Sequence, residues 1–477
     1  MEVKIDRHDK TPIYRQIVRY FEQGILSGQF PPGSNLPPER RLAEQLGVNR
    51  STVSTAYEEL RSTGLVYSVQ GSGTRVSEHS WGFAPSRIPN WHQYASQGVF
   101  QPTLPLVKRI WEAVRDPRNI DFARGQLSPD LLPGEELNHL LQEISLSLQL
   151  GYPDPRGEES LRVAVRDHLN NEYGIQVAPE QILITSGAQQ ALHLITQCLL
   201  NPGDAVGLEK PSYSYSLPLY TSAGLRPFPI PTDEEGLLSN AIVDLHRRHK
   251  VRMIFVNPTY QNPTGSVLNF ERRKSLLKLC GELRIPIVED DAYTALTLDG
   301  APKPPPPLMA MAEGNHGVIY VGTLSKTVAP SLRIGWVIGP VPIINRLADA
   351  KEQMDFGVST ITQQVAEIYL KSGRWEKNVK KLRTALTLRR NTMIQAIQAY
   401  APDGIHWCVP NGGYHIWCRT ESKIEDSTLL ESSISNVIII APGRIYGAEP
   451  GHFRLTYASC RLSDIEEGIE RLTTIIR

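Results

Sequence analysis

The sequence predicts an α/β protein with a small helical unit at its N-terminus. Residues 1–77 hold three short helical patterns followed by a glycine-centred hairpin. Beyond residue 119 the chain alternates short apolar runs with helical segments, which favours a mainly parallel sheet covered on both faces. Residues 78–118 mix prolines, polar residues and aromatics with little periodicity. We therefore expect an N-terminal domain at 1–77, a linker at 78–118 and a C-terminal domain at 119–477.

The composition is that of a globular protein in a reducing compartment. The chain has 477 residues and a formal net charge of zero, so bulk charge does not make it a nucleic-acid binder. Its five cysteines are scattered, which favours free thiols over disulfides or a metal site. Its apolar runs fall short of the roughly 20 residues that cross a bilayer, and its first ten residues are too charged for a signal peptide. We expect a cytoplasmic protein with no metal and no membrane contact.

The N-terminal unit has the pattern of a helix-turn-helix. Apolar residues at four-residue spacing in 11–28 predict an amphipathic helix. Two shorter helical patterns, 37–47 and 48–64, meet in a tight turn at Gly47, and two short strands flank Gly71 as a β-hairpin wing. This arrangement predicts a winged helix-turn-helix.

The third helical pattern carries the side chains that a recognition helix needs. Arg50 and four small hydroxyl residues occupy its first two turns, the part of such a helix that reaches base edges. Residues 1–77 carry a net charge of only about +2. A generic helical subdomain with a solvated polar face is therefore the alternative.

The stretches "LPPERRLAEQLGVNRSTV" and "EELRSTGLVYSVQGSGTRV" resemble the winged helix-turn-helix of the GntR family. The resemblance implies binding to double-stranded operator DNA. It assigns DNA contacts to Arg40, Asn49, Arg50, Ser51 and Gly71. Ser54 stands where the family often has a DNA-contacting arginine.

In the C-terminal region, reactive side chains follow the ends of predicted strands. The turn "TSGAQQAL" opens a helix, and its free amides at Gly187, Ala188 and Gln189 suit an anion such as phosphate. Further candidates in such turns are Tyr213, Asn262, Asp290, Tyr293, Ser325, Lys326 and Arg333. Because ligands of such sheets bind beyond the carboxyl ends of the strands, we expect these groups to line one pocket.

This inventory fits pyridoxal 5'-phosphate. Lys326 would form an imine with its aldehyde, and Asp290 would keep its ring nitrogen protonated so that the ring acts as an electron sink. The other contacts would be Asn262 and Tyr293 on the ring oxygen, Tyr213 on the ring face, and Ser325, Arg333 and the helix N-terminus on the phosphate.

Residues from about 120 to 477 resemble class I aminotransferases of fold type I, through the motifs "SGAQQ", "NPTG", "DDAY", "TLSK" and "LRIGW". The resemblance implies a large lobe with a mainly parallel sheet and a smaller α+β C-terminal lobe. It implies the cofactor contacts given above, with Lys326 as the catalytic Schiff-base lysine. It also implies that Arg454 binds the α-carboxylate of a substrate or effector. Tyr152 would reach the cofactor phosphate of a partner subunit, which implies a homodimer.

The whole chain resembles the MocR subfamily of GntR-type transcriptional regulators. This implies a regulator that binds pyridoxal phosphate and senses an amino compound, or the cofactor itself, by aldimine exchange at Lys326. Two alternatives stay open. One is an active aminotransferase that depends on pyridoxal phosphate, and the other is a bifunctional regulator with residual transaminase activity.

Overall fold

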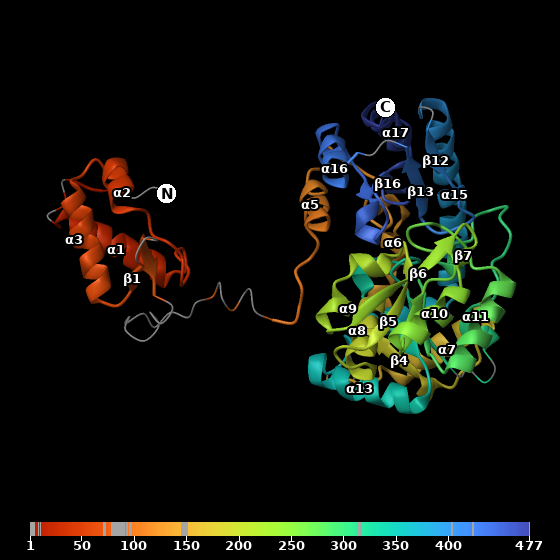
Figure 1. Ribbon diagram of the computed structural model, residues 1–477. Coiled ribbons are helices and arrows are strands. Elements are labelled where there is room, and N and C mark those ends of the chain that lie inside the picture. Colours follow the sequence, from red (N-terminus) through yellow and green to blue (C-terminus); the bar gives the residue numbers. More distant parts are fainter. Residues whose placement is uncertain are drawn as a thin grey trace. The chain divides into compact units, whose positions relative to one another are not determined.

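The computed structural model describes residues 5–7, 9, 11–69, 73–77, 91, 94, 98–144, 151–312, 314, 317–401, 404–421 and 424–476. The chain divides into two compact units, Met1–Gly98 and Val99–Arg477 (Figure 1). Each unit has apolar clusters of its own, so each carries its own stabilising interior.

The N-terminal unit consists of three helices and a β-hairpin. Its elements are α1 (Ile13–Leu26), α2 (Glu39–Leu46), α3 (Arg50–Ser62), β1 (Val66–Val69) and β2 (Gly73–Val76). Gly47 ends α2 with a φ of 60°, a left-handed conformation that glycine adopts without strain. The hairpin strands pair antiparallel, as predicted for the wing. Gly71 at the tip of the wing lies outside the described residues.

An aromatic pair holds the three helices together. The rings of Phe21 on α1 and Tyr57 on α3 lie 5.6 Å apart, edge to face. The Tyr57 hydroxyl donates a hydrogen bond of 2.8 Å to the carbonyl of Pro37, just before α2. Val53 and Leu60 are fully buried on the same side of α3. The opposite side of α3 stays available to a partner.

An eight-stranded sheet forms the large lobe of the second unit, in the order β4-β11-β10-β9-β8-β5-β6-β7. Its strands are β4 (Ile182–Thr185), β5 (Ala205–Lys210), β6 (Arg226–Asp233), β7 (Gly236–Leu237), β8 (Met253–Val256), β9 (Ile287–Asp291), β10 (Val318–Thr323) and β11 (Gly335–Ile338). Strands β10, β9, β8, β5 and β6 run parallel, whereas β11 and β7 pair antiparallel with their neighbours. The sheet is mainly parallel, as the sequence predicted.

Strand β6 is unusual because it contains prolines at three alternate positions. Pro227, Pro229 and Pro231 all lie in its pairing with β5. Alternate residues of a strand turn their backbone N–H groups to the same side, and proline has no N–H to offer. Strand β7 covers only the last two residues of β6 on its outer side. The outer side of β6 is therefore poor in hydrogen-bond donors.

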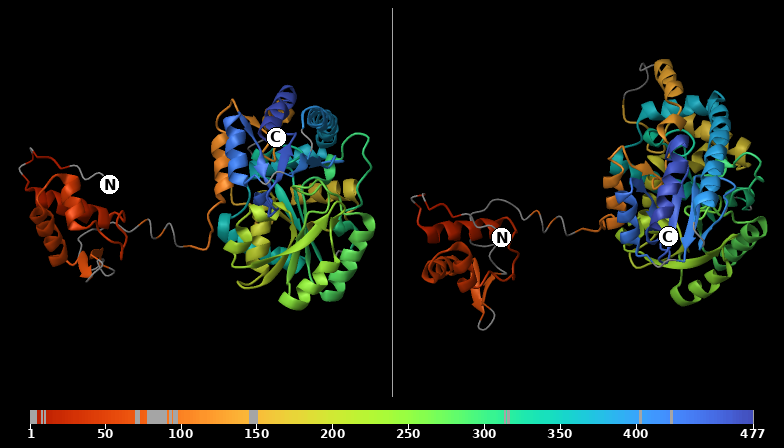
Figure 2. Two further views of the ribbon diagram at one scale, coloured as in Figure 1. Left: turned by 45° about the horizontal axis from the view of Figure 1, so that its top comes forward. Right: turned by 90° about the horizontal axis from the view of Figure 1, so that it is seen from above.

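Helices cover both faces of the sheet (Figure 2). Neighbouring strand residues point to opposite faces, so Leu183 packs in one apolar cluster while Ile182 and Ile184 pack in the other. One face is covered by α8 (Gly187–Leu199), α9 (Leu219–Ser222) and α13 (Val341–Asp355). The other is covered by α6 (Gly134–Glu143), α7 (Glu159–Tyr173), α10 (Asn240–His249), α11 (Phe270–Leu283), α12 (Leu308–Met311) and α14 (Thr360–Lys371).

The smaller lobe is built around an antiparallel sheet with the order β12-β13-β16-β15. Its strands are β12 (Ile405–Trp407), β13 (His415–Thr420), β15 (Ala441–Pro442) and β16 (His452–Thr456). A second pairing joins β14 (Ile438–Ile439) to β3 (Ile120–Asp121). Its helices are α15 (Arg374–Tyr400), α16 (Asp426–Ser435) and α17 (Ile465–Ile475). Because β3 precedes the large lobe in the chain, segments from both ends of the unit build the smaller lobe.

Short 3-10 helices connect these elements. They are η2 (Pro129–Leu131), η3 (Pro179–Gln181), η4 (Tyr213–Ser216), η5 (Thr294–Leu296), η7 (Pro330–Leu332), η8 (Gly443–Tyr446) and η9 (Leu462–Asp464). No helix in the described part of the chain is long and apolar enough to span a membrane.

Helix α5 (Pro105–Ala113) packs against the smaller lobe, beside α16 (Figure 1). Ile110 and Ala113 share an apolar cluster with Leu430 of α16. The guanidinium of Arg109 donates two hydrogen bonds, of 2.6 and 2.9 Å, to the carboxylate of Glu431. This helix lies within the 78–118 segment that we expect to be a linker, so part of that segment is anchored on the second unit.

We expect Leu60→Ala to lower the unfolding free energy of the N-terminal unit by about 2–5 kcal/mol, because it leaves a cavity among fully buried side chains. Thermal denaturation followed by circular dichroism measures this. Glu58→Ala, an exposed position on the same helix, is the control. The transition of the second unit should keep its midpoint, and an equal shift in both transitions would contradict independent cores.

Candidate functional site

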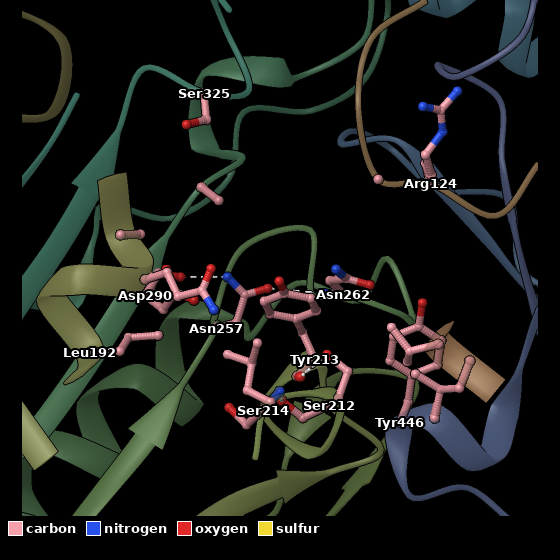
Figure 3. A pocket seen from close by; sticks show the side chains of 18 of the residues that line it. Arg124, Leu192, Ser212, Tyr213, Ser214, Asn257, Asn262, Asp290, Ser325 and Tyr446 are labelled. Atoms are coloured by element: carbon pink, nitrogen blue, oxygen red, sulfur yellow. Dashed lines mark hydrogen bonds between the residues drawn. The ribbon is translucent and has the colours of Figure 1, made fainter. Parts of the chain in front are cut away.

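A cavity of about 500 Å³ lies at the carboxyl ends of the parallel strands. Its walls come from the turns after β8, β9 and β10, the start of α8, the helices η4, η8 and α5, and strand β16. Figure 3 shows Asp290, Asn257, Tyr213 and Asn262 lying together in it. The sequence-predicted residues that line it are Ala188, Gln189, Tyr213, Asn262, Asp290, Tyr293, Ser325, Lys326, Arg333 and Arg454. The structure thus brings into one cavity groups that lie up to 266 positions apart in the chain.

Asp290 stands at the end of β9 with its carboxyl group toward the cavity. Burial raises the pKa of Asp290 to about 7, and repulsion from Asp291 adds to this, while Lys326 opposes it. The backbone carbonyl of Asp290 accepts a hydrogen bond from the side-chain amide of Asn257. A cation brought into the cavity would stabilise the Asp290 carboxylate.

Lys326 lies in the turn after β10, and both its backbone carbonyl and its side-chain amine form hydrogen bonds. Its backbone carbonyl accepts a hydrogen bond from the Tyr414 hydroxyl, and its Nζ donates to the carbonyl of Gly125 at 2.5 Å. Burial and the positive charge of Arg454 lower the pKa of Lys326 to about 8, although Asp290 acts in the opposite direction. A larger share of this amine is therefore unprotonated at neutral pH than in an exposed lysine, and this neutral form is the nucleophile.

The start of α8 forms a cradle with the turn that follows Lys326. Gly187 begins the helix with a φ of 76°, and a Cβ there would lie 2.7 Å from an Arg333 guanidinium nitrogen. Arg333 Nη2 donates to the carbonyl of Ser186 at 2.8 Å. The Thr323 hydroxyl bonds both the Ser325 hydroxyl and the Ile334 carbonyl, each at 3.0 Å, which fixes the Ser325 turn. A helix N-terminus beside an arginine and a hydroxyl is suited to a phosphate.

Arg454 lies across the cavity on β16 and is almost fully buried, with 3% exposed. Its Nη1 donates to Asn262 Oδ1 at 2.8 Å, and its Nη2 donates to the carbonyl of Ala123. Its guanidinium lies 5.0 Å from the centre of the Tyr446 ring. Its Nε has no partner among the described residues, so the group keeps a donor for a carboxylate.

Tyr293 and Tyr213 flank the cavity on separate elements. The Tyr293 hydroxyl lies 3.2 Å from His415 Nε2, and His415 Nδ1 lies 3.1 Å from the Thr456 hydroxyl. Burial raises the pKa of Tyr293 and lowers the pKa of His415 well below its usual range, so both stay neutral. The backbone N–H of Tyr213 donates to the carbonyl of Asn262 at 2.8 Å, which sets η4 against the cavity.

Tyr152 lies outside the cavity in the single chain. Its side chain is 84% exposed, and its ring centre lies 5.0 Å from the ring of Phe356, which is also exposed. Its assignment to the phosphate of a partner subunit stays a prediction.

The predicted DNA contacts lie at the starts of α2 and α3. Arg40, Asn49, Arg50 and Ser51 are all exposed there. Arg40 lies 3.3 Å from Glu44, and Arg50 lies 3.7 Å from the carboxylate of Glu39. Both arginine side chains are more than two-thirds exposed, so these pairs are weak and can exchange for phosphate contacts. The Asn49 side chain makes no capping bond at the start of α3, so its amide is not committed to the helix.

The structure adds cavity residues that the sequence did not single out. Asn257 directly follows β8, and its Oδ1 accepts the backbone N–H of Asn262 at 3.0 Å. Its position after an apolar strand is the same signal that marked Asn262. No apolar strand directly precedes Tyr446, Arg124 or the residues of α5 that line the cavity. The fold alone brings them to it.

Comparison with known proteins agrees with this geometry. Residues 13–76 match the family of bacterial regulatory proteins named gntR, and residues 126–472 match the aminotransferase class I and II family. The uncharacterized HTH-type transcriptional regulator YdfD of Bacillus subtilis is 38% identical over 472 residues, which cover 98% of this chain and 97% of that protein. The protein belongs to the GntR-type transcriptional regulators that carry an aminotransferase domain.

Further comparisons separate the two parts of this regulator. The HTH-type transcriptional regulator NorG of Staphylococcus aureus is 30% identical over 450 residues. The aligned region covers 93% of this chain and 99% of NorG. The kynurenine aminotransferase of Pyrococcus horikoshii, solved in complex with PMP, superposes with a TM-score of 0.75 and 32% identity. It covers 81% of this chain and 98% of the enzyme. These findings confirm the predicted fusion of a winged helix-turn-helix with a fold type I aminotransferase domain.

We expect Lys326 to react with an amine-directed reagent at lower pH than an exposed lysine. Its pKa of about 8, against the usual 10.5, means that its neutral form appears as the pH rises through 8. Labelling of cofactor-free protein with trinitrobenzenesulfonate, mapped by peptide mass spectrometry, measures the midpoint. Lys278, which is 80% exposed, is the internal control. Equal midpoints at the two positions would contradict the expected depression.

Proposed function

We propose that this regulator binds pyridoxal 5'-phosphate and uses it to sense a small amino compound, which changes its binding to double-stranded operator DNA. One observation carries the proposal. The amine of Lys326, with its lowered pKa, and the carboxyl of Asp290, with its raised pKa, line one cavity that also holds an anion cradle. That combination meets the needs of an aldehyde, a ring nitrogen and a phosphate together.

The cavity residues fit this cofactor on three counts. A Cβ at Gly187 would clash with the Arg333 guanidinium, so glycine lets Arg333 approach the start of α8, and both can face one phosphate. Asp290 is buried and gains from a protonated ring nitrogen as its partner. Asn262 uses its Oδ1 to accept from Arg454, which leaves its side-chain N–H groups to donate to a ring oxygen.

When bound, pyridoxal phosphate supplies an aldehyde carbon that forms an imine with an amine and a ring that withdraws electrons from it. Lys326 would occupy that carbon in the resting protein, since its neutral amine lies in the same cavity. An incoming amino compound would compete with Lys326 for it. Displaced Lys326 would then return to a buried site where Gly125 accepts its hydrogen bond.

Arg454 supports an effector that has a carboxylate next to its amine. Asn262 and the carbonyl of Ala123 hold the guanidinium in place, so an arriving carboxylate meets a pre-oriented donor. Burial of the group strengthens this contact because little water screens it.

The exposed aromatic pair of Tyr152 and Phe356 supports a homodimer. The Gln190 side chain donates to Asp355, next to Phe356, at 2.6 Å and accepts the backbone N–H of Ser186 at 2.7 Å. The pair therefore lies beside the start of α8, where the anion cradle is. A second copy that covers this surface would bring its own Tyr152 close to the cradle.

An active aminotransferase is the second candidate. The similarity to an aminotransferase over the whole second unit and the neutral fraction of Lys326 favour it. The two functions differ in what they require of the N-terminal unit. Turnover of amino and keto acids at ordinary enzyme rates without retardation of DNA would favour the enzyme.

We expect purified protein to be yellow and Lys326→Ala to lose the visible absorbance of the protein-linked cofactor. Lys278→Ala, a surface change, should keep it. Absorbance spectroscopy after reconstitution with pyridoxal phosphate measures both. A colourless wild-type protein under these conditions would remove the cofactor assignment.

We expect Arg50→Ala to weaken binding to DNA from upstream of the regulator's own gene by about 1–3 kcal/mol, because a base or phosphate contact is lost. Fluorescence anisotropy at fixed salt measures this. Arg61→Ala, at the other end of α3, is the control. Unchanged affinity in Arg50→Ala would rule out the recognition-helix assignment.

A further inference from the structure

We propose that residues 100–113, called the strap below, form the wall that receives the effector's side chain and transmit occupancy of the cavity toward the N-terminal unit. The effector is then an α-amino acid with a large apolar side chain. This inference rests on the proposed function and names the ligand class and the route of regulation for the same site.

The strap is attached to the large lobe at its first residues. The Phe100 ring lies 6.0 Å from the ring of His193 on α8. The backbone N–H of Gln101 donates to the hydroxyl of Ser222 on α9 at 2.9 Å. The beginning of the strap is therefore expected to move together with the large lobe.

The end of the strap is attached to the smaller lobe. Arg109 pairs with Glu431 of α16 through two hydrogen bonds, and Ile110 shares an apolar cluster with Ile439 of β14. The same short segment thus contacts both lobes. A change in the spacing of the lobes must displace or strain it.

Between these attachments the strap lines the cavity. Thr103, Val107, Ile110 and Trp111 all lie in its wall. The Trp111 side chain is 53% exposed, although a tryptophan in a folded domain normally covers most of its large apolar surface. A ligand that fills the cavity would cover this surface, which favours an apolar group at this end.

The direction of the ligand follows from Arg454. Its guanidinium stacks on Tyr446, and Tyr446 belongs to the same apolar cluster as Ile110. A carboxylate on Arg454 therefore places the rest of the ligand next to Tyr446 and α5.

A neighbouring carboxylate offsets part of the positive charge of Arg124 on this side of the cavity. Arg124 also lines the cavity, but its Nε donates to the Asp121 carboxylate at 2.5 Å. Figure 3 shows its guanidinium directed away from Tyr213 and Tyr446. The Asp121 carboxylate therefore offsets part of the positive charge of Arg124, so this wall attracts an acidic side chain less than an unpaired arginine would.

The strap is also the part of the cavity wall that continues directly into the N-terminal unit. The first compact unit ends at Gly98, two residues before Phe100. A ligand that contacts the strap better in one lobe arrangement will favour that arrangement and with it the position of the strap's first residue, Phe100.

Ligand selectivity tests the wall. Protein reconstituted with pyridoxal phosphate is titrated with L-phenylalanine, L-leucine, L-alanine and L-glutamate, and the absorbance of the bound cofactor is followed. We expect the first two to bind most tightly, and Trp111→Ala and Val107→Ala to weaken them about ten-fold while leaving L-alanine unchanged. Val409→Ala, an exposed valine outside the cavity, is the control. Preference for L-glutamate, or unchanged affinities in Trp111→Ala, would overturn the inference.

The Arg109–Glu431 pair tests the route, since neither residue lines the cavity. Arg109→Gln and Glu431→Gln should leave the titration with L-phenylalanine unchanged but reduce its effect on DNA affinity at least three-fold. The double reversal Arg109→Glu with Glu431→Arg should restore the effect. Arg247→Gln, which breaks an exposed pair on α10, is the control. A full DNA response in both single variants would overturn the route.

These outcomes separate the inference from the proposed function. Loss of the proposed function would show as wild-type protein without cofactor absorbance, or without any amino-acid effect on DNA affinity. If only the role of the strap is wrong, the wild-type protein will respond to amino acids in cofactor absorbance and DNA affinity. The strap variants will then give the same response.

Discussion

The hydrogen bond between Arg454 and Asn262 is the contact on which the rest of the cavity depends. Arg454 belongs to the smaller lobe and Asn262 to the large lobe, and both are buried where they meet. Asn262 is itself held through its backbone N–H by Asn257, which also bonds the carbonyl of Asp290. A chain of amides thus runs from the cationic side of the cavity to the acidic side. Because each member positions the next, the electrostatics of both sides are set together.

The acid and the amine in this cavity both have shifted pKa values. Burial raises the pKa of Asp290, and burial with Arg454 lowers the pKa of Lys326. Each group is thereby less charged than it would be in water. A ligand that brings a ring cation and an electrophilic carbon would interact favourably with both groups.

Much of the fold and the cavity could be predicted because reactive residues follow apolar strands. Asp290 lies at the end of a strand, and Lys326 and Asn262 lie in the turns after two others; parallel strands bring such positions to one edge. Tyr446 and Trp111 could not be found in this way, since they lie on η8 and α5, which reach the cavity through the packing of the smaller lobe. Strand β6 also lacked a clear signal, because three prolines hide its strand pattern.

The prolines of β6 have a consequence for how copies of this protein can meet. A sheet edge with free N–H groups is a template on which another chain can add a strand, and this is a common start of aggregation. Pro227, Pro229 and Pro231 remove those donors along the outer side of β6. The proline rings therefore disfavour the addition of another strand along this part of the edge. A second copy that approaches this edge must therefore bind mainly through side chains, whose identity decides which partner is accepted.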